Sequence, residues 1–465
     1  MTRRGMVLLI GLGLSMPCLG QSTVVLQNPA DAALGAVSRS EDARDRIVRN
    51  DAMDQQAPNV AMRLSVKDAE TIALKNNPAI SVGRLNALAS KQVERETRSN
   101  LWPQTYADLT AVDSRDNSRI TAGGLNNPIV YTRAAGGATV SQLITDFGHT
   151  TNLVASARLQ AKADEQNAAA TRQDVLLAVD QAFYNALQTH AVLRVAEQTV
   201  ASRQLLSDQV AALTKSKLKS DLDLSFANVN LAQAKLLYLD ALNNDKGAMA
   251  SLSAVLGYSR LENFELVTDP ESLAPPPADV DKLIADAFSK RPEILALEFE
   301  SQSAEKLHNA ARDEMFPTIS ALGTIGDAPV RDDRVYGPYA AVGVNLRIPV
   351  FNGFLYTAKA HEADFRAQAA RQRLMDQRNS IARDVRTSWL AASTAFDRVN
   401  VSEQLLAQAN QALDLAQTRY KLGLSSIVEL SQAQLQQTQA EIGNAQAGYA
   451  YRLALSALTY QTTGL

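Results

Sequence analysis

Apolar residues recur every seven positions through the second half of the chain, at Val385, Ala392, Val399, Leu406, Leu413 and Tyr420. This spacing is typical of helices that pack along a shared seam. The stretch from Phe354 to Leu422 contains 69 residues without glycine or proline, and the stretch from His149 to Lys246 contains 98. The pattern therefore predicts two very long helices, each followed by a shorter one. The predicted ranges are 148–216, 224–256, 354–422 and 426–458.

The position four residues further along this seam changes character along the helix. It holds Trp389 and Phe396 first, and then Glu403, Asn410 and Gln417. A wall of helices with one face in water would have such a polar row, and so would an elongated solvated hairpin. The row is compatible with both interpretations.

Alternation with a period of two precedes each long helix. The aliphatic face of 338–350 holds Ala340, Val342, Val344, Leu346 and Ile348, and the other face holds Ala341, Gly343, Asn345 and Arg347. Strands are also predicted at 317–327 and, with weaker alternation, at 103–113 and 133–145. Such alternation is typical of barrel strands with lipid on one side and water on the other. A soluble sheet packed against helices is the alternative.

Aromatic residues flank the predicted strands. Those nearer the helices are Trp102, Phe147, Phe316 and Phe351, and those nearer the loops are Tyr131, Tyr336 and Tyr339. Two such rows are the interfacial girdles of a membrane-spanning barrel. Four strands cannot close a barrel, and an open edge in lipid would leave backbone groups without hydrogen bonds. Two or three chains would then have to pool their strands.

The chain contains two copies of one unit. The matched landmarks are Pro78 and Pro292, Pro103 and Pro317 (both pairs 214 apart), Gly148 and Gly353 (205 apart), and Asp223 and Glu429 (206 apart). One loop between strands is therefore expected to be nine residues longer in the first copy. Each copy should open with a helix that begins at its proline, Pro78 or Pro292. The copies are expected at 64–268 and 280–465, with a proline-rich linker at 269–279.

The N-terminal segment has the pattern of a secretory signal peptide, with a basic start at Arg3 and Arg4, an apolar run, and small residues before a cleavage site at Gly20. We expect residues 1–20 to be this signal and 21–63 to be a polar extension. Cys18 is the single cysteine. It is interpreted as part of the signal, with lipid attachment as the alternative. Without it the chain has no thiol chemistry.

Composition excludes several functions. Hydrophobic residues make up 46% of the chain but aromatic residues only 5%, which suits long helices packed side by side. The net charge of −3 and the lack of a basic cluster argue against a nucleic-acid partner. The four histidines are isolated, and no nucleophile or phosphate-loop motif is present. We therefore expect no enzymatic activity, no catalytic residues, no metal and no cofactor.

Gly423 interrupts the helical pattern once, and Leu424, Ser425 and Ser426 separate it from the next predicted helix. Glycine adopts the left-handed conformation at a helix C-terminus without strain. The interruption therefore predicts a turn at the tip of a helical hairpin, from which the chain returns toward the strands.

The segment from Tyr420 to Ala433, YKLGLSSIVELSQA, resembles the tip motif Y-x-x-G-x-x-x-x-x-[DE]-[VL]-x-x-A of the TolC-type outer membrane efflux proteins. The duplication and the proline-led helices are similar to that family as well. The resemblance implies a homotrimer with a twelve-stranded barrel in the outer-membrane lipid and a helical tunnel through the periplasm. It also implies two partners, a periplasmic adaptor protein and an inner-membrane transporter, and a passive role that catalyses no reaction.

The resemblance also implies a latch at the tip, in which a tyrosine and an arginine of the second hairpin pair with an aspartate of the first. Tyr420 and Asp223 match the tyrosine and the aspartate, whereas Ser425 occupies the arginine position and Lys217 aligns with Gly423. We expect a weaker latch of Tyr420 and Ser425 to Asp223, with the nearby lysines 215, 217 and 219 supplying positive charge. A merely solvated tip is the alternative.

Glu429 and Gln432 would line the aperture, where a ring of Glu429 side chains would favour cations. Three functions remain open at this point. The first is export of small molecules, which the resemblance favours. The second is the exit duct of a type I protein secretion system, and the third is a periplasmic coiled-coil protein that forms no channel.

Overall fold

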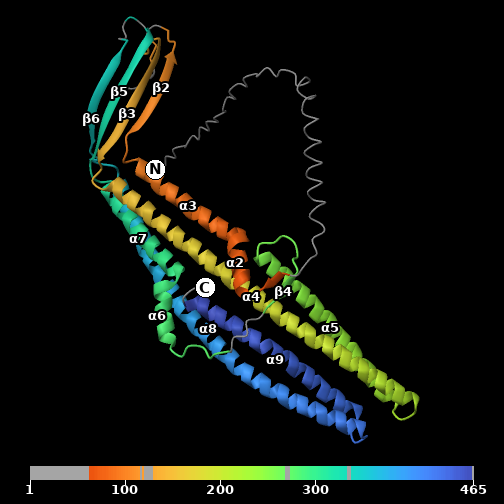
Figure 1. Ribbon diagram of the computed structural model, residues 1–465. Helices are drawn as coiled ribbons and strands as arrows, with labels where there is room; N and C mark the ends of the chain where they lie inside the picture. The colour runs from red at the N-terminus through yellow and green to blue at the C-terminus, as the bar shows by residue number, and fades with distance from the viewer. Residues whose placement is uncertain are drawn as a thin grey trace, which may run out of the picture. The chain divides into compact units, whose positions relative to one another are not determined.

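The computed structural model describes residues 62–115, 118–119, 129–267, 273–331, 333 and 337–462. The expected signal peptide, with Cys18, and residues 21–61 of the expected polar extension lie outside these ranges. The elements, labelled in Figure 1, are β1 (Met62–Leu64), α2 (Val66–Asn76), α3 (Pro78–Ser99), β2 (Gln104–Val112), β3 (Arg133–Thr145), α4 (His149–Lys215), α5 (Asp221–Val255), β4 (Phe264–Leu266), α6 (Val280–Lys290), α7 (Pro292–Asp313), β5 (Thr318–Arg331), β6 (Tyr339–Arg347), α8 (Leu355–Lys421) and α9 (Ile427–Thr462).

The helix boundaries set the register between the two copies. α2 and α3 begin 214 residues before α6 and α7, and α4 and α5 begin 206 residues before α8 and α9. The loop difference is therefore eight residues, and the expected nine was wrong. Each long helix follows two residues with positive φ, which are Phe147 and Gly148 in the first copy and Gly353 and Phe354 in the second. Glycine and phenylalanine have exchanged places, so Gly148 corresponds to Phe354 rather than to Gly353.

Two short helices, α2 and α6, precede the proline-led helices and were not separated from them by the sequence pattern. The residue before each proline, Asn77 or Arg291, has ψ near 120° (122° and 126°). A residue before proline avoids the helical region because the proline ring clashes with it. This single extended residue interrupts the helix and changes the direction of the chain, so that α2 packs against α4 and α6 packs against α8.

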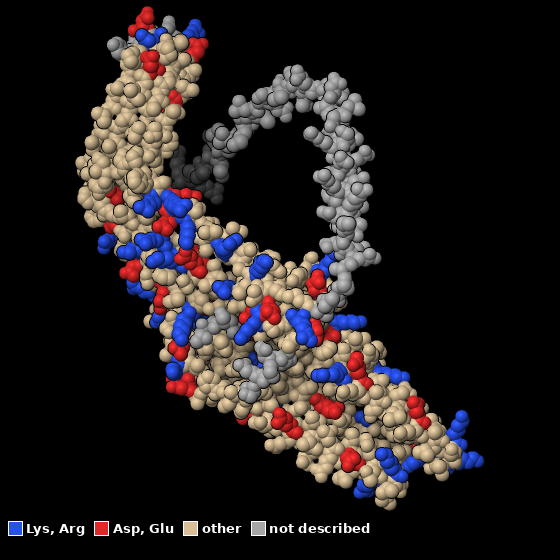
Figure 2. Space-filling view, viewed as in Figure 1, with Lys and Arg blue, Asp and Glu red and all other residues tan. Residues whose placement is uncertain are grey.

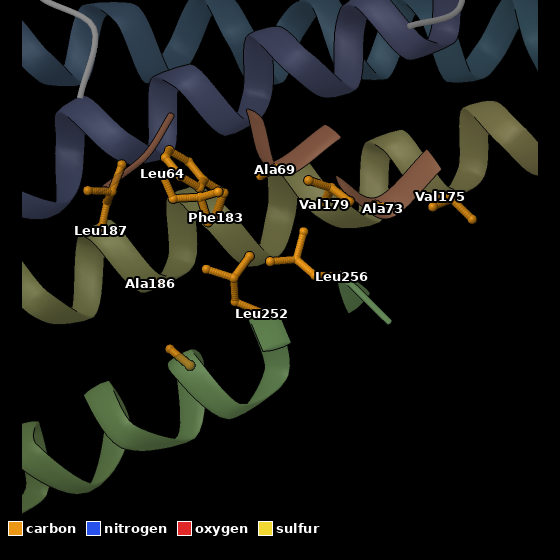
Figure 3. Close-up of a cluster of buried hydrophobic side chains, with 11 residues drawn as sticks. Leu64, Ala69, Ala73, Val175, Val179, Phe183, Ala186, Leu187, Leu252 and Leu256 are labelled. Carbon is orange, nitrogen blue, oxygen red and sulfur yellow. The ribbon is translucent and has the colours of Figure 1, made fainter. Parts of the chain in front are cut away.

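The largest buried cluster joins distant segments around the first long helix. Leu64 of β1 and Ala73 of α2 pack with Phe183 of α4 and Leu252 of α5, all nearly inaccessible to solvent (Figure 3). β1 pairs in parallel with β4, which follows α5. Burying these side chains, at roughly 25 cal/mol per Å², fixes α2 and the C-terminal end of α5 against the middle of α4.

The four longer strands form one sheet in the order β2-β3-β5-β6, with each neighbour antiparallel. Registered partners share a face. The registers, together with the alternation along each strand, assign every residue to one of the two faces. One face carries Leu109, Val140, Gly323 and Val342. The other face carries Asp108, Gly137, Thr324 and Asn345. The apolar face is open, because Leu109 is 92% and Val342 is 89% exposed. The alternation thus holds in both copies. Figure 2 shows that charged residues gather at the loop end of the sheet and at the helices but leave the visible face of the strands between almost free of charge.

Tyr339 differs from its expected place in an aromatic girdle. Its backbone pairs with Gly326, which pairs with Gly137 in the next strand. A methyl group on either glycine would overlap the Tyr339 ring. The ring therefore lies across two glycines on the polar face, where it fills space between β6 and β3. Tyr336 lies outside the described residues.

The seam between α8 and α9 uses a different companion position from the expected one. Ser402, Ala409 and Ala416 are buried, three residues after the apolar positions, whereas Glu403 and Asn410 are exposed. Small residues at this position allow the two helices of the hairpin to approach closely. The polar row of the sequence pattern therefore lies at the exposed edge of the seam, where Oδ1 of Asn410 accepts a hydrogen bond from Nε2 of Gln437 on α9 at 3.3 Å.

Each long helix has 67 residues, or about 100 Å at 1.5 Å per residue. All four sheet strands connect directly to helix ends, and α4 and α8 end at turns on the far side from the sheet (Figure 1). Among the described helices, none is both long enough and apolar enough to cross a membrane. The expected fold class is confirmed: the chain is an α+β protein with two copies of one unit, which together supply four sheet strands and the long paired helices.

Candidate functional site

The two helix turns far from the sheet have the same backbone geometry. In the second hairpin (α8–α9), Gly423 has φ +75°, and the amides of Gly423 and Leu424 donate to the carbonyls of Tyr420 and Arg419. This is a Schellman motif, which satisfies carbonyls that a helix end leaves free. The predicted turn at Gly423 is therefore present in the structure.

Lys217 occupies the equivalent place in the first hairpin (α4–α5), with φ +60°. The amides of Lys217 and Leu218 donate to the carbonyls of Thr214 and Leu213, in the same pattern. A side chain with a β-carbon is strained in this conformation by about 1–2 kcal/mol. The first tip therefore keeps its shape at a conformational cost that the second tip avoids.

Tyr420 lies between the two hairpins. It is 5% exposed and packs with Val210 of α4 and with Ile427 and Leu430 of α9. The Nζ atom of Lys219 lies 3.9 Å from the centre of its ring. The Tyr420 hydroxyl is buried and has no hydrogen-bond partner within the described residues. Burial raises the pKa of Tyr420, and the nearby charge of Asp223 raises it further, so the phenol stays neutral.

Asp223 is engaged within its own turn. Its Oδ2 accepts hydrogen bonds from the amide of Ser220 at 3.1 Å and from the Ser220 hydroxyl at 2.9 Å. These contacts form a capping box at the start of α5. Ser425 is half-buried, and its hydroxyl has no partner among the residues that the structure describes. The structure thus brings Asp223 near Tyr420 but shows no hydrogen bond between the latch residues.

The two aperture residues differ in their contacts. Glu429 is exposed, and its Oε1 lies 3.4 Å from Nε of Arg419 across the tip turn. Gln432 is exposed on the same helix. The sequence motif did not assign a role to Arg419, which places a positive charge one residue before Tyr420.

Arg203 is a residue that the sequence pattern missed. It is only 7% exposed, and its guanidinium donates to the carbonyl of Gln434 at 3.0 Å and to the hydroxyl of Thr438 at 3.2 Å. No carboxylate of the described chain lies within ion-pair distance. Burial lowers the pKa of Arg203 to about 10, against the opposing charge of Glu441. Arg203 therefore joins α4 of the first hairpin to α9 of the second.

A second polar contact joins the hairpins nearby. The amide nitrogen of Asn230 on α5 donates to the hydroxyl of Ser431 on α9 at 2.7 Å. The heptad spacing of Ala196, Arg203 and Val210, all buried, was the signal that could have located Arg203. A buried arginine at such a spacing is unexpected, because the positions of a helix seam are normally apolar.

The described ranges contain no group of three or more His, Cys, Asp or Glu side chains that could hold a metal ion. The site is therefore built from packing, hydrogen bonds and single charges. Such a site can hold the two hairpins together near their tips, or release them.

The family model of outer membrane efflux proteins matches residues 71–258 and 283–464, which places one match in each copy. Protein CyaE of Bordetella pertussis is 25% identical over 379 residues, covering 80% of this chain and 78% of that protein. Outer membrane protein TolC of Escherichia coli is 23% identical over 410 residues, covering 80% and 77%. The crystal structure of the Campylobacter jejuni CmeC outer membrane channel has a TM-score of 0.76 at 16% identity, covering 86% of this chain and 85% of that one.

Proposed function

This chain belongs to the outer membrane efflux protein family, and from that premise we propose that it is the outer-membrane duct through which an inner-membrane pump exports small molecules. Its place is the outer membrane, with the long helices in the periplasm. The duct itself is passive.

The sheet carries this proposal. Its four strands have one continuous apolar face and one polar face, and the outer strands β2 and β6 have unpaired edges in the described chain. Backbone groups at such edges must be paired inside lipid. Three copies would pair β6 of one chain with β2 of the next and close a barrel of twelve strands, with the apolar faces toward lipid and the polar faces toward a water-filled pore.

The helices extend this duct into the periplasm. In a homotrimer, α4 and α8 with their shorter companions would form a wall that reaches about 100 Å from the sheet. The tips would then meet a periplasmic adaptor protein and, through it, an inner-membrane transporter that supplies energy. The duct would be controlled where its wall is narrowest, at the tips.

The tip residues form the proposed gate. Tyr420, held under Lys219 and packed between the hairpins, would keep the second hairpin against the first. Asp223 would support it by shaping the neighbouring turn and by its charge, with Ser425 and Lys217 at the two turns. Glu429 and Gln432 would line the aperture behind this gate.

Single-channel conductance in planar bilayers tests the gate. Asp223→Ala should raise conductance. Ser220→Ala removes the hydroxyl of the same capping box but leaves the carboxylate, and Asp221→Ala removes an exposed charge from the same helical turn. Raised conductance for Asp223→Ala alone would support a latch that depends on the carboxylate. Equal effects of Asp223→Ala and Ser220→Ala would instead assign the effect to the helix cap.

Efflux in living cells tests the function. Cells that lack the chain should accumulate hydrophobic dyes and antibiotics, and the wild-type gene should restore efflux. Crosslinking from Lys217→Cys, at an exposed turn, should capture an adaptor protein. Unchanged dye accumulation, together with loss of one secreted protein from the medium, would overturn small-molecule export in favour of protein secretion. Recovery of the chain in the soluble periplasm would overturn the duct itself.

A further inference from the structure

A cavity of about 300 Å³ lies between the hairpins, just behind the tip turns. Its walls come from α4, from α8 and α9, and from the turn that carries Lys219. The apolar part of the wall includes Leu205, Leu206, Val210, Leu213 and Leu430. The cavity thus adjoins the proposed gate, and its walls exist together only while the hairpins are packed against each other.

Two polar groups in this wall are buried without partners. Tyr420 is 5% exposed and Gln434 is 3% exposed, and neither the Tyr420 hydroxyl nor the Gln434 Oε1 has a hydrogen-bond partner in the described chain. Leaving a buried polar atom without a partner costs about 1–3 kcal/mol. Both atoms are inaccessible to water, so a ligand in the cavity would not reach them, and this cost stays with the packed hairpins.

The charged residues in the wall are all basic. Lys219, with its Nζ above the Tyr420 ring, and Lys421 line the cavity, and no acidic residue of the described chain does. The nearest acidic influence on Tyr420 is Asp223, whose carboxylate is held by Ser220 outside the cavity wall. An anion in this apolar space would therefore meet the ammonium groups of Lys219 and Lys421.

We propose that this cavity binds a small amphipathic carboxylate, with its carboxylate at Lys219 and Lys421 and its apolar body against the leucines of α4. Such a ligand contacts both hairpins. It therefore stabilises the packed state by mass action and, where the tip gates the duct as proposed above, holds the gate closed.

Calorimetric titration of the full chain in lipid nanodiscs tests binding without reference to transport. Hexanoate, hexan-1-ol and hexylammonium have the same apolar body and differ in the charge of the head group. Hexanoate should saturate one site per chain, hexan-1-ol should bind at least about tenfold more weakly, and hexylammonium should not bind. Empty nanodiscs report partition into lipid.

Variants locate the site. Lys219→Gln should weaken hexanoate binding about tenfold, Leu213→Trp should abolish it by filling the cavity, and Lys235→Gln, an exposed lysine of α5 outside the cavity wall, should bind as the wild type does. Equal binding by all four proteins, or equal binding of hexanoate and hexan-1-ol, would overturn the site. Circular dichroism confirms that each variant is folded.

The consequence for gating is measured separately. Hexanoate should lower the open probability of wild-type channels in planar bilayers and leave Leu213→Trp channels unaffected. Saturable binding without any change in conductance would support the ligand site and overturn its link to the gate. If the wild-type chain gave no conductance even without hexanoate, the proposed duct would be overturned. The binding result would not be affected.

Discussion

The two copies of the unit share one backbone plan and differ in the residues that hold it together. Helix lengths and tip geometry match, with Lys217 and Gly423 in the same left-handed position. Yet Arg203 in the α4 seam corresponds to Ala409 in α8, by the 206-residue offset between these helices. A fold built from long helices therefore tolerates different chemistry at equivalent positions, provided that each position keeps its packing partners.

Equivalent positions also differ in chemistry where the residue before each proline contacts the end of α5 or α9. In the first copy, Asn77 donates from Nδ2 to the carbonyl of Val255 at the end of α5. In the second, Arg291 donates to the side chain of Gln461 near the end of α9 and pairs with Glu293 at 2.6 Å. One copy joins the helices through a neutral hydrogen bond, and the other through an arginine that also pairs with the partly exposed Glu293 of its own helix.

Moving the arginine into the second copy should have the largest effect. Ala409→Arg places a long charged side chain in a seam that is closed around a methyl group, so we expect a loss of about 3 kcal/mol or more in unfolding free energy. Ala412→Arg, at an exposed position on the same helix, is the control. Thermal unfolding followed by circular dichroism measures both, and similar midpoints for the two variants would contradict the comparison.

Removing the arginine from the first copy should be much milder. Arg203→Leu loses two hydrogen bonds but also the cost of burying a charge without an acidic partner. We expect a change of about 1 kcal/mol or less in unfolding free energy. A loss comparable to that of Ala409→Arg would show that the guanidinium contacts to α9 contribute more than its desolvation costs.

The junction variants should have effects between those of Ala409→Arg and Arg203→Leu. Arg291→Met leaves the partly exposed Glu293 without its ion-pair partner, also loses the hydrogen bond to Gln461, and should cost about 2–3 kcal/mol. Asn77→Ala removes a helix cap and one hydrogen bond and should cost about 1–2 kcal/mol. Hydrogen exchange followed by mass spectrometry separates the two, because exchange should accelerate at the end of α9 in the first variant and at the end of α5 in the second. Acceleration at both ends in either variant would mean that the junctions are not independent.

Features that repeat locally in the sequence were predictable. The long helices follow from the absence of glycine and proline, the strands from alternation, and the second tip from Gly423. Each of these signals is confined to a few neighbouring residues, which set the local backbone conformation.

Contacts between distant segments were not predictable in the same way. Arg203 and Gln434 are 231 residues apart, and the heptad spacing around Arg203 can indicate a seam position but not its partner on α9. The Tyr339 ring lies across glycines from two other strands, and its place depends on register rather than on its neighbours. The tip residues were found because a motif marks them, but their partners depend on how the hairpins pack.

Exchanging the tip residues should produce smaller effects of opposite sign. Gly423→Ala should cost about 1–2 kcal/mol from backbone strain alone, because nothing lies within 4 Å of the added methyl group. Lys217→Gly should gain up to about 1 kcal/mol by relieving the same strain in the first tip. Lys217→Asn, which tolerates the left-handed region, is the matched control. Chemical unfolding measures the three variants, and a loss of stability in Lys217→Gly would show that the lysine side chain contributes more than its backbone costs.

The smallest expected effect is a pH dependence that belongs to the first copy. Asp180 of α4 is buried, accepts a hydrogen bond from Ser456 and interacts with the carboxyl group of Glu70 of α2, whereas the second copy has Arg386 and Ile284 at the corresponding positions. Burial raises the pKa of both carboxyl groups, and the charge of Asp180 raises that of Glu70 further.

Because the folded-state pKa values lie above the unfolded ones, the folded protein holds these protons more tightly. Their contribution to stability is complete below the unfolded values of 3.8 and 4.5 and is lost as the pH rises through the folded values. Acidification from pH 7 to about pH 5 should therefore raise the Tm of the wild type by about 2 °C, since Glu70 is only partly buried and solvent screens it. Asp180→Asn should flatten this dependence, and Asp240→Asn, at an exposed position of α5, should leave it unchanged. An equal rise in all three proteins would place the titrating groups elsewhere in the chain.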